Sequence, residues 1–324
     1  MILSQTPFRI SFVGGGTDLP DFYRKKNGCV VSTTINKYVY IGAHPSHNGK
    51  IRLQYSQFEE VDKVENVRNT RIRECMKMAG VVNGIEIHSL ADVPIRSGLG
   101  GSSSFTVGLL NALYAYQGKI VSPERLAREA CKIEIDILKE PIGKQDQYIA
   151  AYGGFNYINF KEDESVFVNP VSLNPQIKKY IEERVMLFYV FPRGDASVVL
   201  AEQKKNISKG DNFKAMEELA RLTNFLKSEL LNDRVNRFGE ILHKGWELKK
   251  SFATKITNTL LDEYYQKAIE GGAAGGKICG AGGGGFLLIY SEPEHQEKVR
   301  VALSDLKHTP VKLCGEGSKI VHIE

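Results

Sequence analysis

Cysteine is scarce in this 324-residue sequence and is never arranged for cross-linking. The five cysteines are odd in number, and no C-x-x-C pair occurs among Cys29, Cys75, Cys131, Cys279 and Cys314. This pattern predicts reduced thiols and argues against a disulfide scaffold or a zinc site. His44 and His47 lie three residues apart, but no histidine or cysteine near them in the sequence completes a ligand set, so we interpret them as loop residues.

Long apolar runs are also missing. No stretch of about 18 consecutive apolar residues exists, which argues against a membrane-spanning helix. The N-terminal segment contains Arg9 and Asp18 on either side of a glycine turn, and a signal peptide does not fit that pattern. We therefore expect a cytoplasmic protein that does not associate with a membrane.

A large excess of charge of one sign is absent as well. The 43 Lys and Arg residues exceed the 38 Asp and Glu residues by only five, and basic clusters such as Arg24-Lys25-Lys26 are short. Basic and aromatic residues are not interleaved as in RNA-binding proteins, so we expect no nucleic acid partner. A small acidic substrate, such as a phosphate ester, explains this charge balance as well as nucleic acid does.

The length and the hydrophobic content predict a soluble α+β protein with two domains. With 324 residues, of which 42% are hydrophobic, the chain can bury two cores. Strand-like and helix-like segments occur in separate blocks, which favours the α+β class. We place the domain boundary near residue 182, which gives domains 1–182 and 183–324. The expected strands include 2–13, three short runs within 29–56, 84–90, 155–160, 185–191 and 286–290, and the expected helices include 66–79, 102–116, 123–139, 143–151 and most of 196–270.

The stretch P94-I-R-S-G-L-G-G-S-S-S104 leads directly into an apolar run with helical spacing. Its glycines at 98, 100 and 101 allow a tight turn and bring backbone N–H groups close to a bound anion, and its serines at 102–104 add hydroxyl donors and an N-cap. Such a loop at a helix N-terminus is a candidate phosphate cradle, because free amides and the helix dipole both favour negative charge there. The alternative is an ordinary glycine-serine turn that caps a core helix.

Two familiar nucleotide-binding motifs do not fit the sequence. The segment G271-G-A-A-G-G-K-I278 contains G-x-x-x-x-G-K, but Ile278 occupies the position where a hydroxyl is needed for Mg²⁺, so a P-loop does not fit. The G-x-G at 98–100 lacks a third glycine at the spacing of a dinucleotide fold. Three glycine segments remain, at 14–16, 98–104 and 280–285.

In their order and separation, these three segments resemble the three motifs of the GHMP kinases, the superfamily of galactokinase, homoserine kinase and mevalonate kinase. The resemblance spans nearly the whole chain. The central family motif is P-x-x-x-G-L-G-S-S, and this sequence departs from it only where Gly101 replaces the first serine. The resemblance implies a two-domain α+β fold, with an ATP-binding N-terminal domain of a kind also found in ribosomal proteins and a ferredoxin-like C-terminal domain.

The first motif of galactokinase-like members can be laid without a gap on P7-F-R-I-S-F-V-G-G-G-T-D18. The resemblance then implies that Arg9 lies beside the transferred phosphoryl group and that Asp18 binds sugar hydroxyls. The family Glu-His pair is replaced by Gly15-Gly16, which would open space for a longer or phosphorylated acceptor. The alternatives are a strand-edge charge for Arg9 and a helix N-cap for Asp18.

The segment E134-I-D-I-L-K-E-P-I-G-K-Q-D-Q147 is similar to the galactokinase pattern of a metal-binding glutamate followed by a catalytic aspartate. The resemblance implies that Glu134 and Ser102 hold Mg²⁺ in an all-oxygen site with ATP. It also implies that Asp146 abstracts or orients the acceptor hydroxyl proton, two roles that the sequence leaves open. The alternative for Glu134 is a solvated helix carboxylate.

The resemblance thus predicts the members of an active site. The predicted catalytic residues are Asp146 and Arg9, and the predicted ATP-binding residues are Pro94, Ser97, Gly98, Leu99, Gly100, Gly101, Ser102, Ser103 and Ser104. The predicted substrate-binding residues are Gly15, Gly16, Thr17, Asp18, Lys144, Arg193, Gly282 and Gly283. Among them, Lys144 and Arg193 are our candidates for contacts with an acceptor phosphate.

The details of the motifs most resemble the D-glycero-D-manno-heptose 7-phosphate kinases. That resemblance implies phosphorylation of the anomeric C1 hydroxyl to the 1,7-bisphosphate with ATP and Mg²⁺, for lipopolysaccharide, capsule or S-layer glycan precursors. The chain would bind a phosphorylated sugar as a monomer or homodimer. One alternative is a sugar-1-kinase for a neutral sugar such as fucose or galactose, and another is a catalytically silent nucleotide- or RNA-binding module.

Overall fold

The computed structural model describes the chain except residues 95, 192–193, 195 and 208–209. The first part of the chain forms β1 (Ile2–Val13), α1 (Pro20–Tyr23), β2 (Gly28–Pro45), β3 (Ile51–Gln54), β4 (Phe58–Val61), α2 (Thr70–Ala79), β5 (Ile85–Ala91), α3 (Gly101–Tyr116), α4 (Pro123–Cys131), the π-helix η2 (Lys132–Ile137), α5 (Gln145–Tyr152), β6 (Phe155–Phe160), β7 (Val166–Pro170) and α6 (Pro175–Arg184). The second part forms β8 (Val185–Phe191), α7 (Ala196–Ile207), α8 (Gly210–Leu231), α9 (Phe238–Lys250), α10 (Thr259–Glu270), β9 (Ala273–Ile278), β10 (Gly285–Ser291), α11 (Gln296–Ala302), β11 (Lys307–Thr309), β12 (Leu313–Cys314) and β13 (Lys319–Ile323). Short 3₁₀ turns occur at Val64–Asn66 and Pro293–His295.

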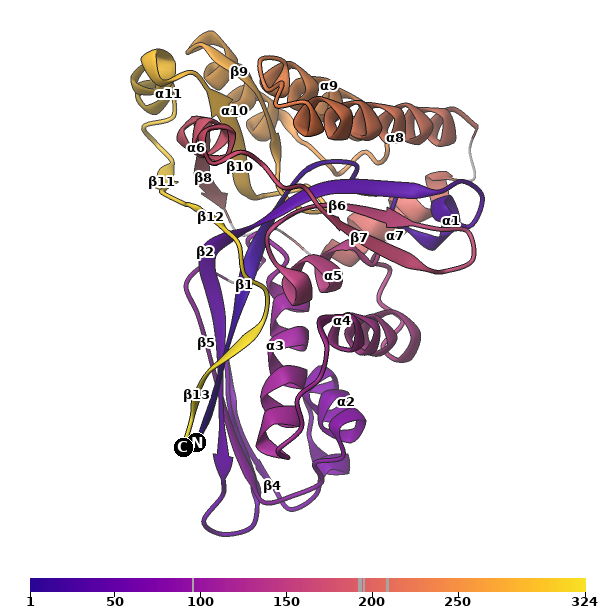
Figure 1. Ribbon diagram of the computed structural model, residues 1–324, viewed down its shortest axis with the longest axis vertical. Helices are drawn as coiled ribbons and strands as arrows, with labels where there is room; N and C mark the ends of the chain where they lie inside the picture. The colour runs from indigo at the N-terminus through magenta and orange to yellow at the C-terminus, as the bar shows by residue number, and fades with distance from the viewer. Residues whose placement is uncertain (95, 192–193, 195, 208–209) are drawn as a thin grey trace.

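The first sheet is built around β2, which pairs with β1 along most of its length. Its order is β13-β1-β2-β5-β3-β4, while β6 and β12 also pair with β2, and β7 pairs with β6. The first part of β2 pairs with β6 and the second part with β5. Helix α3 packs on β1 and β2, with α2 and α4 beside it (Figure 1). The helix that follows the candidate phosphate-binding loop is therefore buried in the core of this domain.

Strand β2 corrects the expectation of two separate short runs within 29–45. It is one 18-residue strand, and the register with β1 shifts between Pro7 and Phe8, where β2 accommodates Asn36 and Lys37 as extra residues. Asn36 is bonded there to Lys312, through its backbone N–H and through its side-chain oxygen. The polar pair thus forms a bulge that a distant segment satisfies, whereas the sequence pattern indicates a turn.

The second sheet has the order β11-β8-β10-β9, and α8, α9 and α10 lie with it in the upper part of the molecule (Figure 1). The predicted boundary near residue 182 falls in α6, just before β8 begins. Strands β12 and β13 lie in the first sheet, although the predicted second domain includes them. The two ends of the chain meet there, since the N-terminal amine of Met1 donates to the carbonyl of Glu324 at 2.7 Å.

The helix predicted over 123–139 changes its winding partway. It is α-helical to Cys131 and continues as the π-helix η2, and Leu138 N–H bonds to the carbonyl of Ile133. A π-turn rotates the following side chains relative to an α-helix and is frequent at functional sites. Here it turns Glu134 fully into the interior. In the part of the chain that the structure describes, no helix is long and apolar enough to cross a membrane.

Candidate active site

A central cavity of about 940 Å³ lies where the two parts of the chain meet. Its walls come from β1, the head of α3, the start of α5, α7, α9 and the glycine segment after β9. All three glycine segments contribute to it, and its lining includes Arg9, Gly15, Gly16, Asp18, Pro94, Ser97, Gly98, Gly100, Gly101, Ser102, Ser103, Asp146, Gln203, Lys249, Lys277 and Gly280. The geometry thus gathers most of the predicted site residues around one space.

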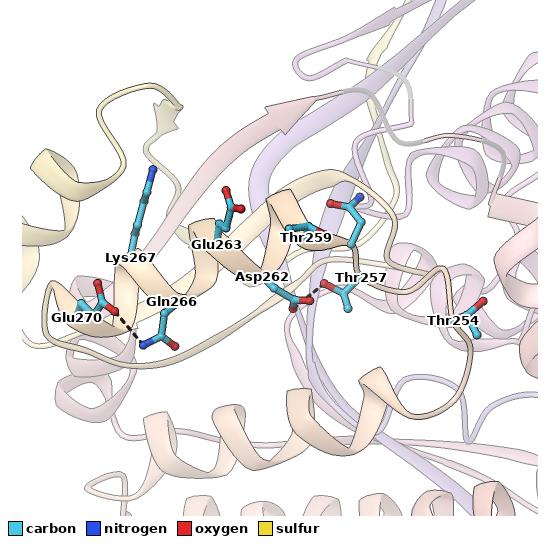
Figure 2. Close-up of a pocket in the computed structure, with 9 residues that line it drawn as sticks. Thr254, Thr257, Thr259, Asp262, Glu263, Gln266, Lys267 and Glu270 are labelled. Atoms are coloured by element: carbon cyan, nitrogen blue, oxygen red, sulfur yellow. Dashed lines mark hydrogen bonds between the residues drawn. The ribbon is translucent and has the colours of Figure 1, made fainter.

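A second hollow, of about 780 Å³, lies along α10. Figure 2 shows its polar lining, with Thr257 bonded to Asp262 and Gln266 bonded to Glu270. None of the predicted site residues lines it. We therefore assign the chemistry to the central cavity.

The glycine loop before α3 has a left-handed backbone conformation that only glycine adopts readily. Gly98 and Gly100 have φ angles of 83° and 79°, in the left-handed region. The backbone N–H of Phe286 donates to the carbonyl of Ser97 at 2.9 Å, which packs this loop on the third glycine segment. The N-cap position of α3 is Gly100, so no side chain caps the first amides of the helix, and the Ser102 side chain is exposed to the cavity. The first amides of α3 are therefore available to an anion.

Gly98→Ala tests this packing, with Gly118→Ala as the matched control. A Cβ on Gly98 would lie 2.5 Å from the carbonyl oxygen of Cys279, whereas a Cβ on Gly118, which also has a positive φ, would meet nothing within 4 Å. The control is expected to lose about 1 kcal/mol of unfolding free energy, from backbone strain alone. We expect Gly98→Ala to lose about 2 kcal/mol or more and to raise KM for ATP at least about tenfold. Equal effects in urea unfolding and in steady-state kinetics would show that this packing is unimportant.

Arg9 and Asp146 form a bidentate ion pair across the cavity floor. Arg9 Nε and Nη2 donate to the two carboxylate oxygens of Asp146 at 2.7 and 2.8 Å, and Nη1 donates to the carbonyl of Gly98 at 2.6 Å. Burial opposes the charge of Arg9, but the neighbouring Asp146 outweighs it and raises the pKa of the guanidinium. The pair therefore joins β1, the glycine loop and α5, and it fixes the direction of the Asp146 carboxylate.

Asp18 lies on the same cavity wall and organises the first glycine segment. Its carboxylate accepts hydrogen bonds from the N–H of Gly16 at 2.9 Å and from the backbone and side chain of Gln145 at 3.2 and 3.0 Å. Burial raises the pKa of Asp18. Gly143 packs so closely that a Cβ there would lie 2.0 Å from Asp18 Oδ2. The structure thus joins the first motif to the segment that carries Asp146.

Glu134 is fully buried behind the glycine loop, where hydroxyl and amide groups surround its carboxylate. Its carboxylate accepts from Ser103 Oγ at 2.8 Å, from Thr106 Oγ1 at 2.7 Å and from the side chain of Gln147. The structure therefore places Ser103 against Glu134, while the neighbouring Ser102, predicted as its partner, faces the cavity. This arrangement follows from the helical geometry of α3, since adjacent residues point about 100° apart. That Ser102 and Glu134 together hold Mg²⁺ stays a prediction.

Glu134 is not among the residues that line the cavity, although charged residues connect it to the lining. Arg71 lies 3.4 Å from Glu134 and also pairs with Glu140, so one guanidinium serves two carboxylates and net negative charge remains. Both Arg71 and Glu140 line the cavity. Carboxylate and hydroxyl oxygens are the ligands that Mg²⁺ prefers. Glu134 is thus not the solvated helix carboxylate of the alternative interpretation.

Like Glu134, the predicted residues Leu99, Ser104 and Thr17 are not among those that line the cavity. Leu99 is buried in the core, and its carbonyl accepts from the N–H of Arg9 at 3.0 Å. The Ser104 hydroxyl donates to the carbonyl of Pro7 at 2.9 Å. The Thr17 hydroxyl donates to the carbonyls of Gly14 and Cys29, both at 2.9 Å. These contacts shape the two motifs, because they hold the loops against the sheet.

The remaining predicted substrate-binding residues, among them the two candidates for phosphate contacts, are placed differently again. Lys144 is outside the lining and donates to the Glu164 carboxylate at 2.5 Å, while its ammonium lies over the ring of Tyr23. Gly282 and Gly283 pack under the cavity against Ile256 and Lys255, and a Cβ on Gly282 would lie 2.5 Å from the carbonyl oxygen of Ile256. Arg193 lies outside the described residues.

The sequence did not point to two lysines that line the cavity, Lys249 of α9 and Lys277 of β9. One signal for Lys249 exists, because it follows the buried residues Leu242 and Trp246 at helical spacing. A lysine on the apolar stripe of a helix indicates either an ion pair or a ligand site.

The interpretation as loop residues holds for His47, which lies in a turn, but is wrong for His44, which lies in strand β2. His44 lies near Glu86 and His88 on the neighbouring strand β5, with their ligand atoms within 4.8 Å of one another. Glu86 is bonded to Arg52 at 2.9 Å and to His88 at 3.1 Å, so the group forms a partly exposed polar network. Its residues are outside the central cavity.

The comparisons with known proteins agree with this geometry. The sequence matches the GHMP kinases N terminal domain over residues 67–154 and the GHMP kinases C terminal domain over residues 226–308. It is 29% identical to the D-glycero-alpha-D-manno-heptose 7-phosphate kinase of Campylobacter jejuni, over 93% of each chain. It is 24% identical to the galactokinase of Pyrococcus furiosus, over 93% of this chain and 92% of that one.

A solved structure extends the match to the whole fold. The structure of a D-glycero-D-manno-heptose 1-phosphate kinase from Bacteroides thetaiotaomicron superposes with a TM-score of 0.82 and 26% identity, covering 100% of both chains. The two family matches together span more than half of the chain. The chain therefore belongs to the GHMP kinase family and is an ATP-dependent kinase.

Proposed function

We propose that this kinase phosphorylates the anomeric C1 hydroxyl of D-glycero-D-manno-heptose 7-phosphate. The observation that carries the proposal is the Arg9–Asp146 ion pair, which lies against the glycine loop at the head of α3 and lines the central cavity. The similarity to two heptose phosphate kinases supports a sugar kinase and favours this acceptor. Gly15 and Gly16 line the acceptor side, where they leave room for a long, phosphorylated sugar.

In the proposed reaction, the phosphates of ATP lie against the Gly98–Ser103 loop and the first amides of α3. The acceptor oxygen attacks the γ-phosphorus, the bond from that phosphorus to the β,γ-bridging oxygen breaks, and ADP leaves. Asp146 orients the hydroxyl and accepts its proton, and Arg9 holds the carboxylate in place beside the transferred group. Ser102, Ser103 and Glu134 would supply oxygen ligands for Mg²⁺, which neutralises phosphate charge when it is bound.

A panel of sugars tests the acceptor class. We expect ATP turnover with D-glycero-D-manno-heptose 7-phosphate to exceed turnover with fucose, galactose or the heptose without its phosphate by about a hundredfold in kcat/KM. Phosphorus NMR of the product should show two phosphate monoesters, one of them on the anomeric carbon. The two heptose kinases are named for different phosphate positions, so the product spectrum also decides the site of transfer. Faster turnover of a neutral hexose would favour the alternative, a neutral sugar-1-kinase.

The setting of the reaction follows from the same proposal. A heptose 1,7-bisphosphate would serve as a precursor of a surface polysaccharide such as lipopolysaccharide, capsule or S-layer glycan. We propose that the enzyme uses ATP and Mg²⁺ in the cytoplasm as a monomer or homodimer. Mass photometry would check the oligomeric state, and magnesium titration of the activity would check the need for Mg²⁺.

A further inference from the structure

Two lysines of the second half of the chain reach the central cavity in buried positions. The exposed fractions of Lys249 and Lys277 are 5% and 4%, and both side chains line the cavity. Lys249 Nζ donates to the carbonyl of Gly280 at 2.5 Å. Lys277 Nζ donates to the carbonyls of Ser11 and Phe12 at 2.9 and 3.1 Å. Each ammonium is thus held by backbone oxygens, which carry only partial charge.

Neither ammonium has a carboxylate partner in the part of the chain that the structure describes. The nearby carboxylates are already engaged, since Asp146 pairs with Arg9 and Asp18 accepts from backbone and amide donors. Burial, together with the nearby charge of Arg9, lowers the pKa of Lys249 to about 8. A buried cation without a counter-charge is costly for folding, so this wall favours an anion.

The side-chain amide of Gln203 is a second buried hydrogen-bond donor in the central cavity. Gln203 of α7 is 1% exposed and lines the cavity, and its Nε2 has no hydrogen-bond partner among the described residues. A Cβ on Gly16 would lie 2.3 Å from this nitrogen, and a Cβ on Gly15 would lie 3.8 Å from Lys249 Nζ. Gly16 therefore packs against Gln203, and its neighbour Gly15 lies near Lys249, so that two adjacent residues of the first glycine segment connect the two donors.

We propose that Lys249 and Gln203 bind the terminal phosphate of the acceptor sugar. The proposal rests on the proposed function, because it assumes an acceptor with a phosphate at the end opposite the reacting hydroxyl. A phosphate monoester offers several acceptor oxygens and about −1.5 to −2 charges at neutral pH, which matches an ammonium beside an amide N–H. Lys144 does not fill this role, because Glu164 neutralises it outside the cavity.

Lys249→Met tests the assignment, with Lys250→Met as the matched control on the same helix. Lys250 is partly exposed and pairs with Glu247 at 2.8 Å. The readout is the ratio of kcat/KM for heptose 7-phosphate to kcat/KM for the same heptose without phosphate. We expect Lys249→Met to reduce this ratio by about tenfold to a hundredfold, the effect of one charged hydrogen bond, mainly through KM for the phosphorylated sugar. We expect Lys250→Met to keep the wild-type ratio.

Gln203→Leu provides a second variant in case Lys249→Met folds poorly, which its melting temperature will reveal. Its ratio is expected to fall by about threefold to tenfold, since it removes a neutral donor. If both variants retain the wild-type ratio, or lose activity equally with both sugars, the phosphate is not bound here. A wild-type enzyme that ignores the phosphate would instead overturn the proposed function, and that result is visible before any variant is made.

Discussion

Asp146→Asn is expected to reduce kcat by about a hundredfold or more while KM for ATP stays within about twofold. The substitution keeps the shape of the side chain but removes its charge and its capacity to accept a proton. One of its two terminal atoms becomes an NH₂ group that faces a nitrogen donor of Arg9, so the bidentate geometry is lost as well. Single-turnover kinetics with saturating ATP and acceptor would measure the chemical step directly.

The matched control for this experiment is Asp136→Asn. Asp136 is exposed on η2 and does not line the central cavity, and its replacement removes the same charge. The control should keep kcat within about twofold. If Asp146→Asn also retains a near-normal rate and binds ATP normally, Asp146 neither accepts nor orients the proton, and the proposed mechanism must be abandoned.

Arg9→Met is the second substitution with a large expected effect, on stability and activity together. It leaves the Asp146 carboxylate without its partner and frees the carbonyl of Gly98, which Arg9 Nη1 contacts at 2.6 Å. Breaking a buried ion pair by removing one member costs about 3–5 kcal/mol, and we expect the lower end because the Asp146 side chain is 25% exposed. Urea unfolding should show this loss, and kcat should fall about a hundredfold or more.

A double-mutant cycle separates the ion pair from the rest of the environment. Arg9→Met combined with Asp146→Asn should lose less stability than the sum of the single variants, because the second substitution removes a charge that the first has stranded. Arg125→Met serves as the surface control, since Arg125 pairs with Glu129 in an exposed position and should contribute about 1 kcal/mol or less. Additive losses at Arg9 and Asp146 would show that the two side chains are not coupled.

The sequence predicts this fold best where local chemistry determines the backbone. The expected strand 2–13 agrees with β1, and the helix expected over 102–116 begins one residue earlier, at Gly101. Both elements are defined by local features of the sequence, namely the glycine turn and the apolar periodicity. The long strand β2 escaped prediction, because the bulge at Asn36 is satisfied by Lys312, far away in the sequence.

The site was predictable only through the family resemblance. Nothing in the composition or the periodicity brings Arg9 next to Asp146, which are 137 residues apart, and the resemblance alone suggested that they share a site. The same resemblance pointed to Ser102 beside Glu134, whereas helical geometry places Ser103 there. Lys249 was not predicted, because a lysine near the end of a helix ordinarily reads as a solvated charge.

The pairing of β13 with β1 has a consequence for the order of folding during synthesis. All of the second sheet lies between these two strands in the chain, so the ribosome makes β1 long before the strand that covers its edge. Until then one border of the first sheet offers unpaired amides and carbonyls to other nascent chains. We expect the growing polypeptide to depend on chaperones during that interval, and the final strand to act as the closure that ends the dependence.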